Sequence, residues 1–193
     1  MSLDIAAQQE RFLSLCREKI HREGLEDLLG WLTDKKKCDF FTAPASTKYH
    51  GAYEGGLCEH SLDVWDFAQK FAAVCPCEVS EESLLISSLF HDLCKVNFYG
   101  TEYRNQKING EWQKVPVYVV NEKFAFGGHG SKSVFVTERF MRLDPEEAIA
   151  INCHMGYSEG GDSVRNVSRA YESSPLAWII HAADEAATFL LER

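Results

Sequence analysis

The spacing of apolar residues along the chain predicts a mainly helical protein. In most segments apolar side chains recur every three or four positions, which is the spacing of one face of an α-helix. The segment from Leu84 to Phe90 differs, because it has no charged residue and is apolar nearly all round, so we expect this helix to lie inside the molecule. Helices are expected over residues 4–22, 25–32, 57–74, 81–95, 131–142 and 145–154, and over a last stretch that begins at residue 175.

One predicted element is not helical: a small β-hairpin inserted at about residues 103–120. Asn109-Gly110 is a dipeptide typical of tight hairpin turns, and the valines and the tyrosine of residues 115–120 have strand character. Loops are expected over residues 40–56 and 157–162, which contain turn-forming glycines or proline. The fold class predicted from these elements is therefore mainly α, a helical bundle with one β-hairpin.

The size and composition of the chain suit one compact domain. It has 193 residues, of which 45% are hydrophobic and 12% aromatic, enough for a substantial core. We expect residues 1–38 to form N-terminal helices and residues 40–192 to form the core, with the hairpin as an insertion. The chain has no run of roughly 18 to 20 apolar residues, the length that crosses a membrane. The segment Met1 to Arg11 lacks the apolar core of a signal peptide, so a cytoplasmic protein is expected, with no membrane partner.

The charge of the chain narrows the class of partner. A formal net charge of -9 argues against a broad nucleic-acid surface, which would be visible as a basic face. A local positive site is still compatible with this charge, because bound divalent cations could supply it. A small phosphorylated partner is therefore favoured over a nucleic acid.

The seven cysteines do not follow the paired spacing of a structural zinc site or of a secreted disulfide framework. The stretch Cys75-Pro76-Cys77 is too closely spaced to ligate a metal tetrahedrally by itself. Cys58, Cys94 and Cys153 stand near histidines, but a helix would point each of them away from its neighbouring ligand. We therefore expect reduced thiols that pack as small apolar side chains.

Polar residues follow the apolar helix directly. His91, Asp92 and Lys95 would share one face if that helix continued to Lys95. Burying an imidazole beside a carboxylate is costly unless a partner compensates them, and the usual partners are an ion pair or a metal ion. A histidine next to an aspartate favours the metal ion.

Other histidines and a second aspartate would complete a metal site. Imidazole with carboxylate suits zinc, iron, manganese or nickel better than calcium, and magnesium is a further candidate. The candidate metal ligands are His60, His91, Asp92, His129, His154 and Asp184. Six side chains exceed the needs of one catalytic metal, so a bridging Asp92 would let them hold two divalent ions roughly 3.5 to 4 Å apart. The alternative to one or two ions is a buried polar network without metal.

The order of these residues resembles the signature of the HD-domain superfamily of metal-dependent phosphohydrolases. The matching stretches are Ala43 to Ala45, His50 to His60, Phe90 to Lys95, Gly128 to Gly130, His154 to Gly156 and His181 to Asp184. The similarity is greatest to the HD module of YhaM-type 3′-5′ exoribonucleases and to stand-alone bacterial or phage HD hydrolases. His129 and His154 resemble the extra ligands of two-metal members. The resemblance implies a helical bundle in which helices carry most of the ligands to one central site.

Two departures from the exoribonucleases bear on the substrate. Those enzymes carry an OB-like nucleic-acid domain ahead of the HD module, whereas residues 1–38 of this chain precede the match. Their double histidine is Tyr49-His50 here. Both departures argue against a nuclease.

Further residues are candidates for contacts with a substrate. Lys95 would meet a phosphate or be a solvated residue at a helix end. His50 would contact the substrate, transfer a proton, or be a structural loop residue. His181 would line the pocket or orient a neighbouring ligand from behind, and the second role is preferred. Lys132, and less strongly Arg165, would meet a phosphate or lie on the surface.

The leading hypothesis is metal-assisted hydrolysis of a phosphate ester, with a small nucleotide-like substrate. Metal ions held by Asp92 would activate a water molecule, and Lys95 would help to offset charge on the phosphoryl oxygens, so these two are the candidate catalytic residues. A di-iron oxygenase that cleaves C–C or C–P bonds would use the same ligands. A metal-stabilised binding module without turnover is a third hypothesis, and a 3′-5′ nuclease or phosphodiesterase acting on nucleic acid is a further alternative.

Overall fold

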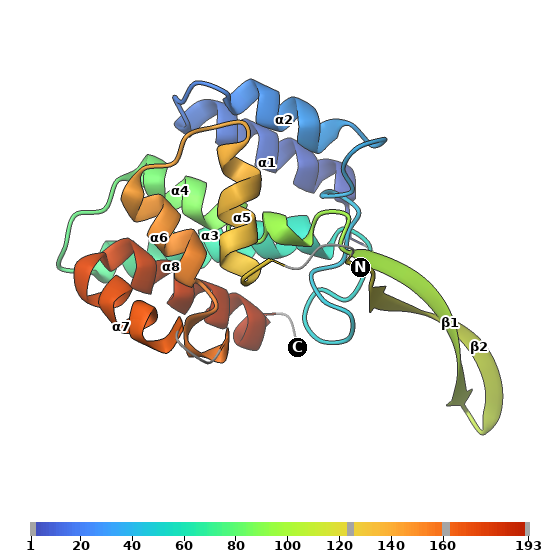
Figure 1. Cartoon of the computed structure of the whole chain (residues 1–193). Coiled ribbons are helices and arrows are strands. Elements are labelled where there is room, and N and C mark those ends of the chain that lie inside the picture. Colours follow the sequence, from blue (N-terminus) through green and yellow to red (C-terminus); the bar gives the residue numbers. More distant parts are fainter. Residues whose placement is uncertain (1–2, 123–125, 160–162, 192–193) are drawn as a thin grey trace.

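The computed structural model describes residues 3–122, 126–159 and 163–191 (Figure 1). Within these ranges the chain forms helices, one two-stranded antiparallel sheet and short 3-10 or π turns. The helices are α1 (Ile5–Lys19), α2 (Leu25–Thr33), α3 (Gly56–Val74), α4 (Glu81–Phe90), α5 (His129–Glu138), α6 (Pro145–Cys153), α7 (Ser163–Ser173) and α8 (Pro175–Ala186). The strands are β1 (Tyr99–Ile108) and β2 (Glu111–Val120). This arrangement confirms the predicted fold class.

Helix α4 lies at the centre of the helical body. All residues from Leu84 to Phe90 are buried, as their uncharged sequence predicted. Helix α4 packs against α3, α6 and α8, while α1 covers α3 and α4 from the other side. In Figure 1, α1 and α2 form one side of the body and α7 and α8 form the opposite side. The residues that end α4 therefore enter the middle of the molecule.

The termini of several helices follow local signals in the sequence. Ser80 caps α4 by accepting a hydrogen bond from the Ser83 backbone N–H. At α6 the predicted capping box is present, with the Glu147 side chain accepting from the Asp144 backbone N–H at 2.8 Å. Gly24 separates α1 from α2 with a left-handed φ of 86°, which favours glycine. These boundaries agree with the predicted ones to within a few residues.

Arg22 joins the N-terminal helices to the rest of the body. Its guanidinium donates to Glu147 Oε1 and Asp144 Oδ2, both at 2.8 Å, and to Glu82 Oε2 at 3.3 Å. The Glu147 side chain is fully buried, so Arg22 supplies the positive charge that this carboxylate needs. One side chain thus connects the α1–α2 corner to the starts of α4 and α6.

Replacing Arg22 with methionine is expected to lower the free energy of unfolding by about 3 kcal/mol, because Glu147 would stay buried without its cation. Denaturation by urea at neutral pH measures the change. Arg17→Met is the matched control, since Arg17 pairs with Glu26 on the surface, where an ion pair contributes little. An equal loss of unfolding free energy in the two variants would show that the burial of Glu147 does not explain the effect of Arg22→Met.

The hairpin extends away from the helical body (Figure 1). Its turn is Asn109-Gly110, with φ values of 52° and 89°, and Ile108 pairs with Glu111 across it. The sequence predicted this turn and strand β2, but β1 begins at Tyr99, ahead of the predicted start at about residue 103. Most side chains of both strands are exposed.

Some predicted boundaries and segments were wrong, and one helix was not predicted. Helix α4 ends at Phe90 and is followed by a 3-10 turn over Leu93–Lys95, where a continuous helix to Lys95 was expected. Helix α5 ends at Glu138, short of the predicted end at residue 142. Helix α7 was not predicted, because its sequence is mostly polar and only a few apolar residues, among them Val167 and Ala170, anchor it to the core. In the predicted loop 157–162, residues Gly156–Glu159 form a 3-10 turn and 160–162 lie outside the described residues.

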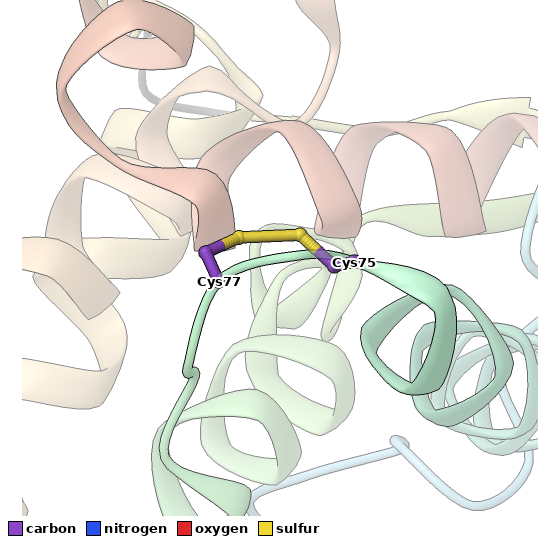
Figure 2. The surroundings of a disulfide bond; sticks show 2 residues. All are labelled: Cys75 and Cys77. Carbon is purple, nitrogen blue, oxygen red and sulfur yellow. A yellow bond between two sulfur atoms is a disulfide. The ribbon is translucent and has the colours of Figure 1, made fainter.

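The expectation of seven reduced cysteines was wrong for two of them. Cys75 and Cys77 form a disulfide at the end of α3 (Figure 2). The chain turns at Pro76 so that the two Cα atoms are 5.4 Å apart, within the usual range for a disulfide. The other cysteines are buried free thiols, as predicted. Burial raises the pKa of Cys58 to about 12, so this thiol is protonated and unreactive at neutral pH.

No helix in the described ranges is both long and apolar enough to cross a membrane.

Candidate metal centre

The end of α4 brings two candidate ligands into the middle of the body. His91 still has helical dihedral angles, but Asp92 (φ -109°, ψ 19°) leaves the helix and begins the 3-10 turn. The tighter turn directs the Asp92 carboxylate toward the same space as the His91 ring, whose Nε2 lies 3.5 Å from Asp92 Oδ2. Both side chains are buried.

Helices α3, α6 and α8 add three more ligands to this space. His60 on α3 lies with Nε2 3.1 Å from Asp184 Oδ1 on α8 and 3.2 Å from His91 Nε2. His154 follows α6 directly, and its Nε2 is 3.6 Å from Asp92 Oδ1. Five of the six predicted ligands therefore meet at one point, although they come from four separate parts of the sequence.

Two groups of ligand atoms in this cluster are compact enough to hold an ion. His60, His91 and Asp92 form one group, and His91, His154 and Asp184 form the other; within each group the ligand atoms lie within 4.8 Å of one another. The two oxygens of Asp92 face different neighbours, since Oδ2 is 3.7 Å from His60 Nε2 and Oδ1 faces His154. This is the geometry that a bridging carboxylate would need, and bridging by Asp92 stays a prediction.

Backbone carbonyls fix the orientation of two of the histidine rings. His91 Nδ1 lies 2.8 Å from the Ser88 carbonyl oxygen, and His154 Nδ1 lies 2.7 Å from the Ile151 carbonyl oxygen. A carbonyl only accepts, so each ring carries its proton on Nδ1 and directs the lone pair of Nε2 into the cluster. Each carbonyl belongs to the last turn of a helix, where it has no helical partner of its own.

One buried atom in the cluster lacks a partner that a metal ion would supply. Among the described residues, His154 Nε2 is buried without a hydrogen-bond partner, because the Asp92 carboxylate stands just beyond hydrogen-bonding distance. A buried polar atom of this kind is costly unless something binds it. The nitrogen and oxygen donors present fit a divalent transition metal, and this fit argues against a network of hydrogen bonds alone.

The electrostatics favour the metal-binding protonation state at His91, Asp92 and Asp184. At His154 burial lowers the pKa, but the neighbouring Asp92 carboxylate outweighs burial and raises the pKa overall, so metal binding there would displace a proton. Burial lowers the pKa of His91 to about 4, so the ring is neutral at neutral pH. Burial alone would raise the pKa of Asp92, but the charge of Lys95 beside it outweighs burial and holds that pKa well below its usual value. Burial would likewise raise the pKa of Asp184, but its hydrogen bond with His60 outweighs burial and lowers that pKa. Both carboxylates are therefore ionised.

Lys95 is a buried partner of Asp92, and this burial excludes the alternative of a solvated lysine at a helix end. Its Nζ lies 2.6 Å from Asp92 Oδ2, and the residue is 9% exposed. Burial lowers the pKa of the ammonium, but the Asp92 charge more than compensates and raises it overall. Lys95 therefore stays charged beside the carboxylate.

His129, the sixth predicted ligand, lies beside the cluster rather than within either compact group. It is the first residue of α5, and its Nδ1 is 3.3 Å from the Cys94 sulfur. Cys94 was expected to point away from the ligands, and this was wrong: its sulfur also lies 3.6 Å from Asp92 Oδ1. The 3-10 turn is the physical reason, because it rotates Cys94 away from the position that a continued α-helix would give it.

Close contact between α5 and α6 sets the position of His129. A Cβ atom on Gly130 would lie 2.2 Å from the Asn152 carbonyl oxygen, so only glycine fits between these helices. We expect Gly130→Ala to destabilise the protein by about 2 kcal/mol in thermal or urea unfolding, although alanine normally stabilises a helix. Gly127→Ala is the control, since its Cβ would meet only Ser131 Oγ at 3.7 Å. A neutral or stabilising Gly130→Ala would contradict the assigned contact.

The remaining candidates for substrate contacts have different surroundings in the structure. His181 donates from Nδ1 to the His154 carbonyl oxygen at 2.7 Å and stacks on Tyr171, which agrees with the preferred role of orienting a ligand. His50 lies with its ring centroid 5.2 Å from that of His60. Lys132 is paired with Glu122. The side chain of Arg165 lies outside the described residues.

A cavity of about 930 Å³ opens onto the cluster. Its walls come from the loop before α3, the base of the hairpin, the start of α5 and the end of α8. They include Ser46, Lys48, Tyr49, His50, Asp92, Lys95, Phe98, Tyr99, His129, Ser158, Asp184, Glu185 and Phe189. Such a mixture of aromatic side chains and a few polar groups is typical of a small-molecule site.

Sequence reasoning missed Tyr99 as part of this wall. Its hydroxyl donates to the Ala45 carbonyl oxygen at 3.0 Å and so joins the hairpin to the loop before α3. Burial raises the pKa of Tyr99 to about 12, and the hydroxyl stays protonated. The contact spans more than fifty residues of sequence, and no local pattern around Tyr99 indicates it.

Comparison with known proteins gives two matches and one negative result. The family model described as the HD domain matches residues 57–188. Dihydroneopterin 2′,3′-cyclic phosphate phosphodiesterase from Methanocaldococcus jannaschii is 30% identical over 148 residues, which cover 75% of this chain and 51% of that protein. The chain thus spans about half the length of this curated relative. No solved structure matches the chain significantly.

Proposed function

Because the chain belongs to the HD-domain family, we propose that it is a metal-dependent phosphohydrolase that cleaves a phosphodiester bond in a small, nucleotide-like molecule. The observation that carries this proposal is the buried cluster of histidines and aspartates at the wall of a cavity that suits a small molecule. The similarity to a phosphodiesterase supports the same reaction class.

The proposed metal site uses one or two divalent ions. His60, His91, Asp92, His154 and Asp184 would hold them, with His129 as a sixth ligand or as a group facing the substrate. Such ions, when bound, activate water and offset the negative charge of a phosphoryl group. Manganese, iron, nickel and zinc suit these donors, and magnesium remains a candidate.

Lys95 and His50 have distinct roles in the proposed reaction. Lys95 holds the Asp92 carboxylate in place, and its remaining N–H groups could donate hydrogen bonds to a phosphoryl oxygen at the cavity wall. His50 lines the same cavity near His60, where an imidazole could give a proton to the departing oxygen. His181 and Lys132 are not among the residues that line this cavity, so we propose no direct substrate contact for them.

The proposed substrate carries a flat heterocycle beside its phosphodiester. Tyr49, Phe98, Tyr99 and Phe189 give the cavity aromatic walls on which such a ring could stack. The Methanocaldococcus jannaschii relative is named for dihydroneopterin 2′,3′-cyclic phosphate, a cyclic phosphodiester with a heterocycle. We therefore favour a cyclic or short diester over a phosphate monoester.

Elemental analysis and an activity assay together test the proposal. Protein purified without added metal is analysed for metal content per chain, stripped with a chelator, and reloaded separately with each candidate ion. Hydrolysis of bis(p-nitrophenyl) phosphate and of 2′,3′-cyclic nucleotides is expected with at least one ion and absent after chelation. The monoester p-nitrophenyl phosphate is the matched control and should be the poorer substrate.

Two results would overturn the proposal. Activity that is unchanged after treatment with the chelator would exclude a metal-dependent reaction. Iron that survives purification with an optical or EPR signal, together with no diester hydrolysis by any reloaded form, would favour the di-iron oxygenase instead.

A further inference from the structure

The two faces of the hairpin differ in chemistry. Directly paired residues of an antiparallel sheet point to the same side, and consecutive pairs along the strands point to opposite sides. The pairs Tyr103↔Pro116 and Lys107↔Trp112 therefore share one face, and Lys114 lies between them on that face. We call the side formed by every second pair, from Tyr99↔Val120 to Lys107↔Trp112, the aromatic face.

The aromatic face is exposed and positively charged. Tyr103 is 66% exposed and Trp112 is 73% exposed, and both rings lie on this same face. Lys107 and Lys114 stand beside them, both exposed. Among the ten residues of this face, all within the described part of the chain, none is acidic, although the chain as a whole has a net charge of -9.

The opposite face of the hairpin has neither property. It carries Glu102, Arg104 and Glu111, and its large apolar side chains are aliphatic. Arg104 pairs with Glu102 at 3.3 Å, so its charge is offset on its own face. The concentration of aromatic rings with unopposed lysines on one side is therefore not a general property of the hairpin.

The aromatic face is continuous with the cavity. Tyr99 and Val120, the pair at the base of the hairpin, line the cavity that opens onto the metal cluster. From this pair to Lys107↔Trp112 the face extends for eight residues, or about 27 Å at the rise of a β-strand. Glu54 lies near Tyr118 at the inner end of the face, so the positive charge belongs to the outer half.

We propose that the aromatic face binds a single-stranded oligonucleotide whose terminal phosphodiester enters the cavity. Exposed rings offer stacking surfaces for bases, and lysines beside them meet the phosphates, which is the combination that single-strand binding requires. Protein interfaces are also rich in tyrosine and tryptophan, but they are depleted in lysine, so the two lysines beside the rings favour a nucleic acid over a protein partner. This inference rests on the proposed function, because the cavity must accept a phosphodiester.

Fluorescence anisotropy with the metal-loaded full chain tests the inference. The probe is a labelled single-stranded oligonucleotide of about ten nucleotides with hydrolysis-resistant phosphorothioate linkages. Trp112→Ala is expected to weaken binding about tenfold or more through lost stacking, and Trp112→Phe to restore much of it. Replacing both Lys107 and Lys114 with alanine should reduce the slope of log affinity against log salt by about one.

Matched variants on the opposite face control for damage to the hairpin. Arg104→Ala removes a cation and Gln113→Ala truncates the neighbour of Trp112, and both should bind the oligonucleotide as the unchanged chain does. All of these variants should hydrolyse bis(p-nitrophenyl) phosphate with unchanged kcat/KM, since none of them touches the metal cluster.

The outcomes separate this inference from the proposed function. Equal weakening by Trp112→Ala and Gln113→Ala, or no binding by the unchanged chain, would overturn the inference while small-diester hydrolysis stood. A dimer in light scattering that Trp112→Ala converts to monomer, without any effect on the oligonucleotide, would overturn it in favour of a second copy of this chain. If the chain does not hydrolyse small diesters, that result counts against the proposed function. The anisotropy measurement would then test only whether the aromatic face binds the oligonucleotide.

Discussion

Asp92→Ala is expected to abolish metal binding at the cluster and to lower kcat/KM for a small phosphodiester about a thousandfold or more. The Asp92 carboxylate lies 3.5 to 3.7 Å from the Nε2 atoms of His60, His91 and His154. Its loss breaks up the group of His60, His91 and Asp92 and also removes the carboxylate oxygen that lies beside His154 in the other group. Metal content per chain and steady-state kinetics with the reloaded protein measure the two effects.

A second effect of Asp92→Ala must be separated from the first. The substitution leaves the Lys95 ammonium buried without its counterion, which is expected to cost about 3 to 5 kcal/mol of stability. The double variant Asp92→Ala with Lys95→Met removes both charges and should regain most of that stability in urea unfolding. It should still lack metal and turnover. Metal-dependent hydrolysis in the stable double variant would contradict the assigned role of Asp92.

Lys95→Met alone is expected to destabilise the metal-free protein by about 3 kcal/mol, because Asp92 then stays ionised in the core without its partner at 2.6 Å. Bound divalent ions would compensate the same carboxylate, so the loss should be much smaller in the loaded protein. Turnover should fall about a hundredfold, the usual effect of removing one group that offsets charge on a reacting phosphoryl group. Thermal unfolding with and without metal, followed by kinetics, measures both changes.

Lys132→Met is the matched control for this prediction. Like Lys95, Lys132 is paired with a carboxylate, in its case that of Glu122. Unlike Lys95, it does not line the cavity. Its replacement should change neither the effect of metal on stability nor kcat. Destabilisation by Lys95→Met that is equal with and without metal would show that Lys95 does not share Asp92 with the ions.

Features of the fold that depend on neighbouring residues were predictable from the sequence. The Asp144–Glu147 capping box, the Asn109-Gly110 turn and the uncharged stretch from Leu84 to Phe90 are local patterns, and each forms the expected structure. The convergence of five ligands was inferred from their types and from the resemblance to HD proteins. Spacing along the chain could not have given it, since the ligands come from separate helices.

Features that depend on distant contacts or on a single backbone rotation were not predictable. The 3-10 turn after α4 places Cys94 against His129, and nothing in the sequence distinguishes this turn from another turn of α-helix. Lys132 pairs with Glu122, which lies ten residues earlier and outside α5, so helical spacing does not predict the contact. The Cys75–Cys77 disulfide depends on how the chain turns at Pro76 after α3.

The antiparallel pairing at the base of the hairpin has a consequence for how such a chain can diversify. Because Tyr99 and Val120 are direct partners, the chain leaves the helical body and returns to it at nearly the same place. A ribbon of another length or composition could be exchanged between these two positions without altering the path of α4 or α5. Evolution or protein engineering could therefore change which molecules are recognised at the edge of the cavity, while the buried histidines and aspartates stay unchanged.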